Sequence, residues 1–175
     1  GSTVKIMTCL LALENTQLTD EVTMTATRVS GVTDGGASIS SQVDEVFTVE
    51  QCLYAIMVAS ANDIALQIAE HVGGSVDGFV QQMNTRAQEL GCTNTVFTNP
   101  TGLPDDNQHT TAHDMALIMQ AAIQNESFRT IAAATSYTIP ATNKAAARNL
   151  TSKFTMTDAG STGFYEGCIG GKEGY

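Results

Sequence analysis

The sequence is short of positive charge. It contains 8 Lys and Arg against 18 Asp and Glu, which gives a formal net charge of -10. Proteins that bind nucleic acids or anionic surfaces rely on clustered Lys and Arg to neutralise phosphate groups. The composition therefore argues against a nucleic-acid partner and against direct electrostatic docking on an anionic surface.

Long apolar runs are also missing. No stretch approaches the roughly 18 residues of a membrane-spanning helix. The sequence from Gly1 onward has no signal-peptide pattern, as expected of a mature piece of a protein. The chain also has no internal repeat, low-complexity segment or linker. With 42% hydrophobic and 15% charged residues over 175 positions, it suits one globular domain over residues 1–175.

Cysteine motifs for metal or redox chemistry are absent. The four cysteines are Cys9, Cys52, Cys92 and Cys168, and none forms a C-x-x-C pair. We interpret them as small buried hydrophobic side chains. One disulfide between them stays an open alternative at this point.

Two histidines have the spacing of a candidate metal site. His109 and His113 have His-x-x-x-His spacing, with Asp105 and Asp106 nearby. His109 falls before the expected helix cap at Thr111, so the two rings are not expected on one helix face. We interpret all four as polar loop-to-helix residues, and the sequence predicts no metal and no cofactor.

The hydrophobic pattern predicts a helical block flanked by short strands, an α+β fold class. Expected helices cover residues 2–15, 49–59, 64–73, 75–91, 111–122 and 126–133. Expected strands or extended segments cover 19–26 and 137–139, with a further strand from 168–169 into 172–174. Residues 30–41 and 93–106 are expected to be loops, and a Gly- and Thr-rich loop follows residue 139.

Ser2 and Lys5 stand three positions apart at the start of the first expected helix. One helical turn places both side chains on the same face. A serine beside an amine that can lose its proton is the minimal form of an activated nucleophile. The alternative is a capping serine with a solvated lysine. The following helix is apolar around much of its circumference, so a buried Lys5 needs a partner or a lowered pKa.

A second polar group interrupts two apolar helices. Ser60-Ala61-Asn62 joins segments that are otherwise hydrophobic. Small polar groups in such surroundings must find hydrogen bonds or serve a site. The five methionines Met7, Met57, Met83, Met115 and Met119 fall at core positions of helices, where packing explains them.

Three short patterns occur in a fixed order: Ser-x-x-Lys at Ser2, Ser-x-Asn at Ser60 and Lys-x-Gly at Lys172. This order resembles the penicillin-binding and serine β-lactamase superfamily. Longer stretches are similar to D-alanyl-D-alanine carboxypeptidases, namely residues 2–14, 60–63, 69–75, 79–84, 97–103 and 109–114. The resemblance covers almost the whole chain. It implies a β-lactamase/DD-peptidase-like transpeptidase fold with a partial antiparallel sheet.

The resemblance also implies a role for each motif residue. Ser2 would attack a peptide carbonyl and become acylated, with Lys5 as its base. Ser60 would relay a proton between Lys172 and the leaving amine, and Asn62 would hydrogen-bond the substrate amide and steady Lys5. The implied enzyme is a serine-type D-Ala-D-Ala carboxypeptidase that acts on peptidoglycan pentapeptides and is acylated by β-lactams.

The third motif departs from the family pattern. Lys172-Glu173-Gly174 stands where the family usually has Lys-Thr-Gly, whose threonine helps to hold the terminal carboxylate of the substrate. Glu173 brings like charge there. Three alternatives stay open: Glu173 is protonated beside the substrate, its side chain turns away, or the enzyme is weak on free carboxylate ends. We expect impaired carboxypeptidase activity with penicillin acylation retained or slowed. The family's oxyanion hole would use the backbone N–H groups of Ser2 and Tyr175.

Two alternatives remain. A non-catalytic module that binds wall peptides or β-lactams is favoured by Glu173 and opposed by the intact Ser2, Lys5, Ser60 and Asn62. A β-lactamase is a distant alternative because its usual Glu-x-x-x-Asn loop finds no match. The implied location is extracytoplasmic, in the cell envelope or secreted, with a membrane anchor, if present, outside this chain.

The family's sheet is built largely from strands before the nucleophile and after the third motif. We therefore expect a truncated catalytic domain that exposes an apolar helix face. A cloning remnant at Gly1-Ser2 is the alternative origin of the serine, but its match to the motif register favours a native nucleophile.

Overall fold

The computed structural model describes residues 1–30 and 36–174, and their fold is α+β, as predicted. The helices are a 3₁₀ turn at Ser2–Val4, α1 (Lys5–Asn15), α2 (Ala26–Ser30), α3 (Val49–Val58), α4 (Asn62–Gly73), α5 (Val76–Glu89), α6 (Ala112–Ala122) and α7 (Glu126–Ala132). The strands are β1 (Glu21–Thr23), β2 (Val46–Thr48), β3 (Ser136–Ile139) and β4 (Arg148–Thr151). Part of the loop predicted over 30–41 lies outside the described residues.

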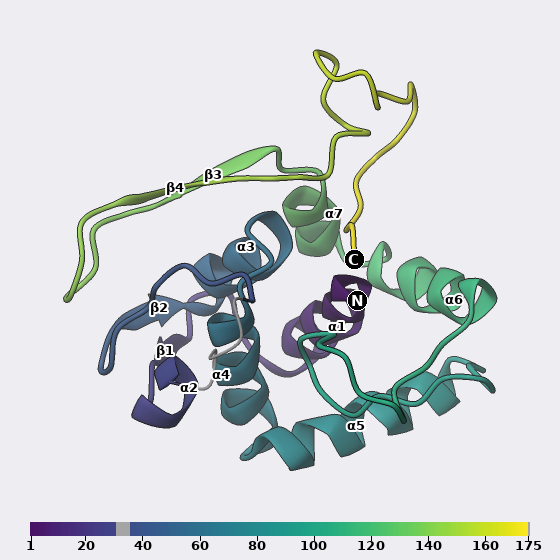
Figure 1. The fold of residues 1–175 in the computed structure, drawn as a ribbon, viewed down its shortest axis with the longest axis horizontal. Helices are drawn as coiled ribbons and strands as arrows, with labels where there is room; N and C mark the ends of the chain where they lie inside the picture. Colours follow the sequence, from purple (N-terminus) through teal and green to yellow (C-terminus); the bar gives the residue numbers. More distant parts are fainter. Residues whose placement is uncertain (31–35, 175) are drawn as a thin grey trace.

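Helix α1 occupies the centre of the helical block. It packs against α3, α4, α5, α6 and α7, and Figure 1 shows these helices grouped around it. A helix in this position needs an apolar surface on most sides, which its buried run from Lys5 to Ala12 provides. The rest of the fold is therefore arranged around the helix that begins beside Ser2.

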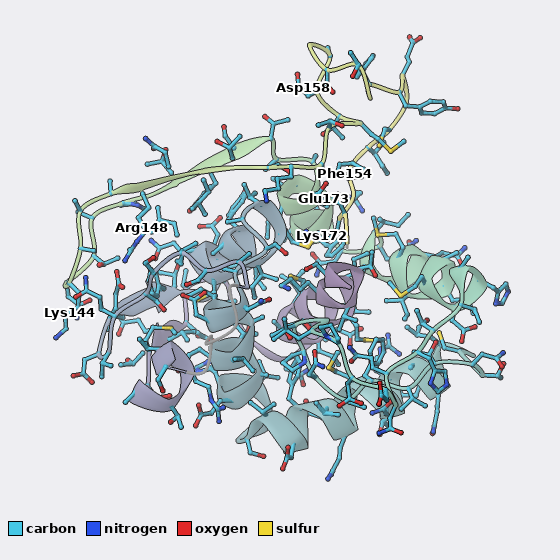
Figure 2. The ribbon with its side chains drawn as sticks, in the orientation of Figure 1. Lys144, Arg148, Phe154, Asp158, Lys172 and Glu173 are labelled. Carbon is cyan, nitrogen blue, oxygen red and sulfur yellow. The ribbon has the colours of Figure 1, made fainter. Side chains whose placement is uncertain are left out.

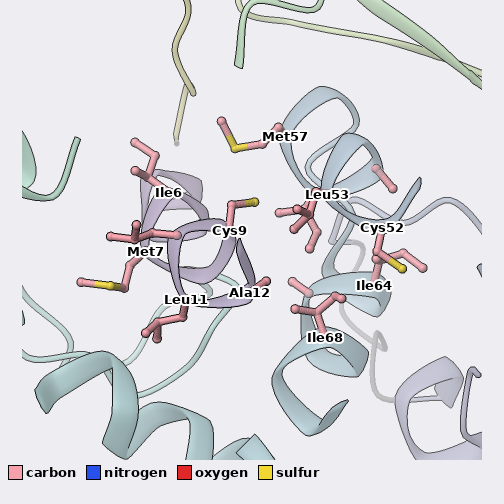
Figure 3. Packing of buried hydrophobic residues seen from close by; sticks show 14 of the residues in the cluster. Ile6, Met7, Cys9, Leu11, Ala12, Cys52, Leu53, Met57, Ile64 and Ile68 are labelled. Carbon is pink, nitrogen blue, oxygen red and sulfur yellow. The ribbon is translucent and has the colours of Figure 1, made fainter. Parts of the chain in front are cut away.

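The core is one continuous apolar cluster. On the side of α1 that faces α3 and α4, Cys9 and Ala12 approach Leu53 and Ile68 (Figure 3). All four cysteines are free thiols: Cys9, Cys52 and Cys92 are buried, and Cys168 is half-buried. The predicted packing role is confirmed for the three buried cysteines, and the disulfide alternative is wrong.

Helix boundaries follow the capping residues in the sequence. Thr48 and Gln51 form a capping box at the start of α3, and Ser75 and Thr111 cap α5 and α6 through their side-chain oxygens. Gly74 ends α4 in a left-handed conformation with φ 71°. The six predicted helices are confirmed within one or two residues at their ends.

The strands form two small antiparallel sheets of two strands each, β1 with β2 and β3 with β4. In the segment expected to be extended over 19–26, Val22 and Met24 are buried, but Ala26 is exposed and opens α2, a helix that the sequence pattern did not indicate. Strand β4 was also not predicted, because only Leu150 of its four residues is buried. The alternation of buried and exposed residues in β4 is too short to be recognised in the sequence without knowledge of its pairing to β3.

The strand expected around residues 168–174 is wrong. In the part of the chain that the structure describes, residues 152–174 contain no strand. The N–H of Gly171 donates to the carbonyl of Ala132 at the end of α7. A strand requires a ladder of such bonds to a neighbouring strand, and a single anchoring bond cannot define one. The segment instead follows α7 back toward the start of α1 (Figure 1).

The β3–β4 hairpin is held to the helical block by a buried ion pair. Arg148 Nη1 lies 2.7 Å from Oε1 of the fully buried Glu45, and Thr142 Oγ1 donates to the same carboxylate. The Arg148 guanidinium also lies over the ring of Phe47. These contacts fix the hairpin whose β4 end leads into the candidate site.

The expectation of an exposed apolar helix face is wrong for the described helices. Their large apolar side chains are all buried or half-buried, while Met156, Phe164, Tyr165 and Ile169 in the C-terminal segment are exposed. None of the described helices has the length and apolarity needed to span a membrane.

Candidate functional site

Lys5 lies at the N-terminal end of α1 with its side chain fully buried, at 0% exposure. Its Nζ lies 3.2 Å from Ser2 Oγ and 2.7 Å from Asn62 Oδ1, and it also donates to the carbonyl of Thr101. Burial of an ammonium is unfavourable unless hydrogen bonds replace its water. Three oxygens around one nitrogen meet that requirement and fix the amine beside the serine.

Ser2 and Ser60 form the second link of this network. Ser60 Oγ donates to Ser2 Oγ over 2.9 Å, so the Ser2 hydroxyl lies between a lysine amine and a second hydroxyl. Ser60 has φ 59°, a left-handed conformation that non-glycine residues seldom adopt. Strained backbone of this kind clusters at functional sites, where surrounding structure holds it.

The loop over residues 99–102 completes the surroundings of Lys5, and sequence reasoning assigned it no role in the site. Asn99 Oδ1 accepts bonds from Thr101 N, Thr101 Oγ1 and Gly102 N, and Thr8 Oγ1 donates to the Pro100 carbonyl. The loop is thereby fixed with the Thr101 carbonyl toward Lys5. An Asn-Pro pair followed by Thr and Gly signals a tight turn, but not where its carbonyl points.

The third motif reaches the same place from the far end of the chain. Lys172 Nζ donates to the backbone carbonyl of Glu173 over 3.0 Å. A Cβ added to Gly174 would lie 3.0 Å from Ser2 N, so this glycine sits against the turn that carries Ser2. No hydrogen bond joins Lys172 to Ser60 among the described residues. Tyr175, predicted to supply an oxyanion-hole N–H, lies outside them.

Two lysines interact electrostatically in this site. Burial, and next the positive charge of Lys172, lower the pKa of Lys5 to about 7. The pKa of Lys172 is itself lowered, chiefly by burial. An amine with a pKa near 7 is about half in its basic, uncharged form at neutral pH, whereas an ordinary lysine is almost entirely charged. By contrast, burial raises the pKa of the neighbouring Cys9 thiol to about 12, so it remains protonated and unreactive.

Residues of all three motifs line one cavity of about 350 Å³, with the buried Lys5 behind its wall. Its wall includes Ser2, Ser60, Asn62, Lys172 and Glu173 from the predicted site, together with Gly36, Ala37, Met57, Val58, Ala59, Thr101, Gly102, Leu103, Pro104, Thr151 and Lys153. The volume is in the range that holds a small ligand or a short peptide end. The structure therefore brings all three motifs to one concave surface.

Asp63 supports the Ser-x-Asn motif from behind. Its Oδ2 accepts bonds from Ser38 Oγ and from the hydroxyl and N–H of Ser41, and Asn62 N donates to Ala37 O. Asp63 is 1% exposed, and its Oδ1 has no hydrogen-bond partner within residues 1–30 and 36–174. These bonds hold the segment that forms the Ala37 side of the cavity. The buried carboxylate stood next to the motif in the sequence, but its role was not predicted.

The two histidines discussed as metal ligands lie apart from this cavity. His109 precedes α6 and its Nδ1 lies 3.0 Å from the Asn107 carbonyl. His113 lies in the first turn of α6, with Nδ1 3.4 Å from Asp114 Oδ1. Within residues 1–30 and 36–174, no three His, Cys, Asp or Glu side chains are grouped as a metal site requires.

Comparisons with known proteins agree with the geometry. A family model described as D-alanyl-D-alanine carboxypeptidase matches residues 1–168. A D-alanyl-D-alanine carboxypeptidase of Mycobacterium tuberculosis is 33% identical over 180 residues, covering 100% of this chain and 57% of the relative. One from Bacillus subtilis is 37% identical over 132 residues, covering 73% of this chain and 33% of the relative.

Solved structures give the same result for the fold. The crystal structure of a Streptomyces DD-transpeptidase has a TM-score of 0.90 at 29% identity and covers 100% of this chain and 70% of that one. The crystal structure of a Mycobacterium tuberculosis D-alanyl-D-alanine carboxypeptidase has a TM-score of 0.86 at 30% identity. The match covers 99% of this chain and 62% of that one. The predicted transpeptidase-like fold is confirmed. The chain spans about one third to three fifths of the length of these curated relatives.

Proposed function

The chain belongs to the D-alanyl-D-alanine carboxypeptidase family, and we propose that it is the catalytic part of a serine hydrolase. This hydrolase removes the terminal D-alanine from peptidoglycan stem peptides. Its proposed substrates are pentapeptides that end in D-Ala-D-Ala, and β-lactams would acylate the same serine. Substrates of this kind lie outside the cytoplasm, so the proposed location is the cell envelope.

Ser2 is the proposed nucleophile and Lys5 its base. The neutral Lys5 amine takes the proton from Ser2 Oγ as the oxygen bonds to the substrate carbonyl carbon. The C–N bond to the terminal D-alanine then breaks, and Ser60 passes a proton to the departing amine while it takes one from the Lys172 ammonium. In the second half of the reaction the oxygen of a water molecule bonds to the acyl carbon and one of its protons returns to Lys172. The ester bond to Ser2 breaks, and Lys5 gives its proton back to Ser2 Oγ. Asn62 would hold the substrate amide, and Lys172 would keep the pKa of Lys5 low.

One observation carries this proposal. The Ser2 hydroxyl lies between Lys5 Nζ at 3.2 Å and Ser60 Oγ at 2.9 Å, and the pKa of Lys5 is lowered to about 7 by burial and by Lys172. A capping serine beside a solvated lysine would have neither feature. An available base in contact with a hydroxyl that borders a cavity supports nucleophilic catalysis.

Labelled penicillin tests the proposal directly. Incubation should give a covalent adduct with the mass of one acyl group, and peptide mapping should place it on Ser2. Release of D-alanine from a diacetylated lysyl-D-alanyl-D-alanine peptide should accompany it. Long incubation that leaves the protein unlabelled, together with an uncleaved peptide, would overturn the proposal.

Replacement of Glu173 with Thr is expected to raise the rate of D-alanine release by about tenfold. A carboxylate about 4 Å from that of the substrate is repelled by about 4 kcal/mol at an effective dielectric constant of 20. Water at this half-buried position screens much of the effect, and about 1.4 kcal/mol remains for a tenfold change. The measurement is D-alanine released per minute by the two proteins.

Glu173→Gln is the matched control, because it removes the charge without adding a hydroxyl. A similar gain in Gln and Thr assigns the effect to charge, and a gain in Thr alone assigns it to the hydroxyl. No gain with threonine would sink the idea that Glu173 impairs turnover.

The same residue favours a second candidate function, a module that binds wall peptides or β-lactams without turnover. Glu173 lines the cavity, where it would oppose the terminal carboxylate of the substrate. The penicillin experiment separates the two candidates. A Ser2 adduct rejects a chemically inert site, whereas reversible binding of the peptide without an adduct favours the binding module.

A further inference from the structure

A third lysine borders the cavity and has no place in the three motifs. Lys153 follows β4 and lines the cavity together with Thr151 at the end of that strand. The cavity wall thus carries two cations besides the buried Lys5, namely Lys153 and Lys172, and one anion, Glu173. Lys153 therefore adds a positive charge to the cavity that the three motifs do not account for.

The position of Lys153 relative to the third motif is fixed by packing. Gly171 lies against the ring of Phe154, since a Cβ on this glycine would be 2.4 Å from Phe154 Cζ. The N–H of Ser152 donates to the Thr135 carbonyl at 2.8 Å, which anchors the chain on the other side of Lys153. Figure 2 shows Phe154, Glu173 and Lys172 beside one another. Lys153 therefore emerges next to the third motif rather than from a distant loop.

The charged side chains Lys153, Lys172 and Glu173 do not form ion pairs with one another in the described part of the chain. Among the described residues, no ion pair within 4.0 Å involves Lys153, Lys172 or Glu173. Lys172 uses one of its donors on the carbonyl of Glu173, and burial lowers its pKa, while Lys153 contributes a smaller lowering. The charge of Glu173 acts in the opposite direction and raises the pKa of Lys172. Lys172 thus interacts with Glu173, whereas Lys153 has no partner within ion-pair distance among the described residues.

We propose that Lys153 is a specificity-determining residue that, with Lys172, holds the terminal carboxylate of the substrate against the opposing charge of Glu173. The proposal rests on the proposed function, which supplies a ligand with a free carboxylate. The cavity would then carry a net positive charge at its Lys153 side despite the glutamate. A substrate whose end is neutral would gain nothing from Lys153.

Matched acid and neutral ligands test this role. Lys153→Met should lower kcat/KM for diacetylated lysyl-D-alanyl-D-alanine by about fivefold, the effect of one partly solvated charge contact. For the same peptide with a terminal carboxamide, the change should be below about twofold. Lys153→Arg keeps the charge and should retain at least half of the wild-type preference for the acid.

Acylation by penicillin gives the same comparison where peptide turnover is slow. The acylation rate of Lys153→Met should fall about fivefold with penicillin, which bears a carboxylate, and remain nearly constant with its methyl ester. Lys144→Met is the control, because this lysine lies at the far end of the β3–β4 hairpin (Figure 2) and does not line the cavity. Lys144→Met should leave the acid-to-neutral rate ratio unchanged for both the peptide and penicillin.

The outcomes distinguish the role of Lys153 from the proposed function. A wild-type protein that cleaves or is acylated, with an acid-to-neutral ratio unchanged in Lys153→Met, overturns the role of Lys153 alone. An equal fall for acid and neutral ligands also overturns it, because it indicates a structural effect. A wild-type protein that neither cleaves the peptide nor reacts with penicillin overturns the proposed function, and the role of Lys153 with it.

Discussion

Lys5→Met should react with labelled penicillin about 10³-fold more slowly than the wild-type protein. The substitution removes the only amine in contact with Ser2 among the described residues, and loss of a general base reduces rates by about 10² to 10⁴. Met fills a similar volume without a charge, so the buried position remains packed. The measurement is the second-order rate constant of acylation, followed by labelled protein on a gel or by intact mass.

The pH profile distinguishes a base from a structural lysine. Only uncharged Lys5 can accept the Ser2 proton, so acylation should rise with pH and reach half its maximum near pH 7, the value to which the pKa of Lys5 is lowered. Lys172→Met removes the second cause of that lowering, so the pKa of Lys5 should increase and the rising limb should move to higher pH. A profile that is flat between pH 5 and pH 9 in the wild-type protein, or full activity in Lys5→Met, would contradict the assignment.

Gly102→Ala should reduce acylation by about 10²-fold. A Cβ at this position would lie 2.0 Å from the Gly1 carbonyl oxygen and 3.0 Å from Ser2 N, and both are backbone atoms that cannot rotate away. Either the 99–102 loop or the turn carrying Ser2 must move. A displacement of about 1 Å at a reacting group can lower a rate by about 10². The same acylation assay measures it.

Gly91→Ala provides a matched control for backbone strain. Gly102 has φ 82° and Gly91 has φ 81°, so alanine at either site adopts an unfavourable left-handed conformation that costs about 1–2 kcal/mol. Nothing lies within 4 Å of a Cβ on Gly91. If the clash with the Ser2 turn matters, only Gly102→Ala loses acylation. Equal loss in both variants would mean that general destabilisation is responsible.

The predictable parts of this protein depend on short-range patterns. Ser2 and Lys5 are neighbours on one turn, and Thr48 with Gln51 marks the start of α3 by a local rule. The role of Thr101 could not be predicted, because its contribution is a backbone carbonyl brought to Lys5 from 96 residues away. No side-chain type encodes such a contact.

The errors have a related cause. Only Cys168 and Ile169 favoured a strand over residues 168–174, and three glycines follow them. A strand also exists only with a partner at its edge, which a local pattern cannot supply. Conversely, β4 forms because β3 is available, with Tyr137 opposite Leu150. Lys153 follows β4 and lines the cavity. Because β4 was not predicted from the sequence, the position of Lys153 in the cavity was not predicted either. The resemblance located the motif residues but not the loop and hairpin that complete their surroundings.

The separation in sequence of the groups around Ser2 also determines when the reactive arrangement can form during folding. Lys5 bonds to Asn62 across 57 positions and to Thr101 across 96, and Gly174 must then settle against the Ser2 turn. Closing long loops is slow because their entropy is lost before the contacts form. A partly folded chain with only its N-terminal helix has the serine but lacks its surroundings. Under the proposed chemistry, covalent labelling would count native molecules alone, so the fraction labelled would serve as a titration of correctly folded protein.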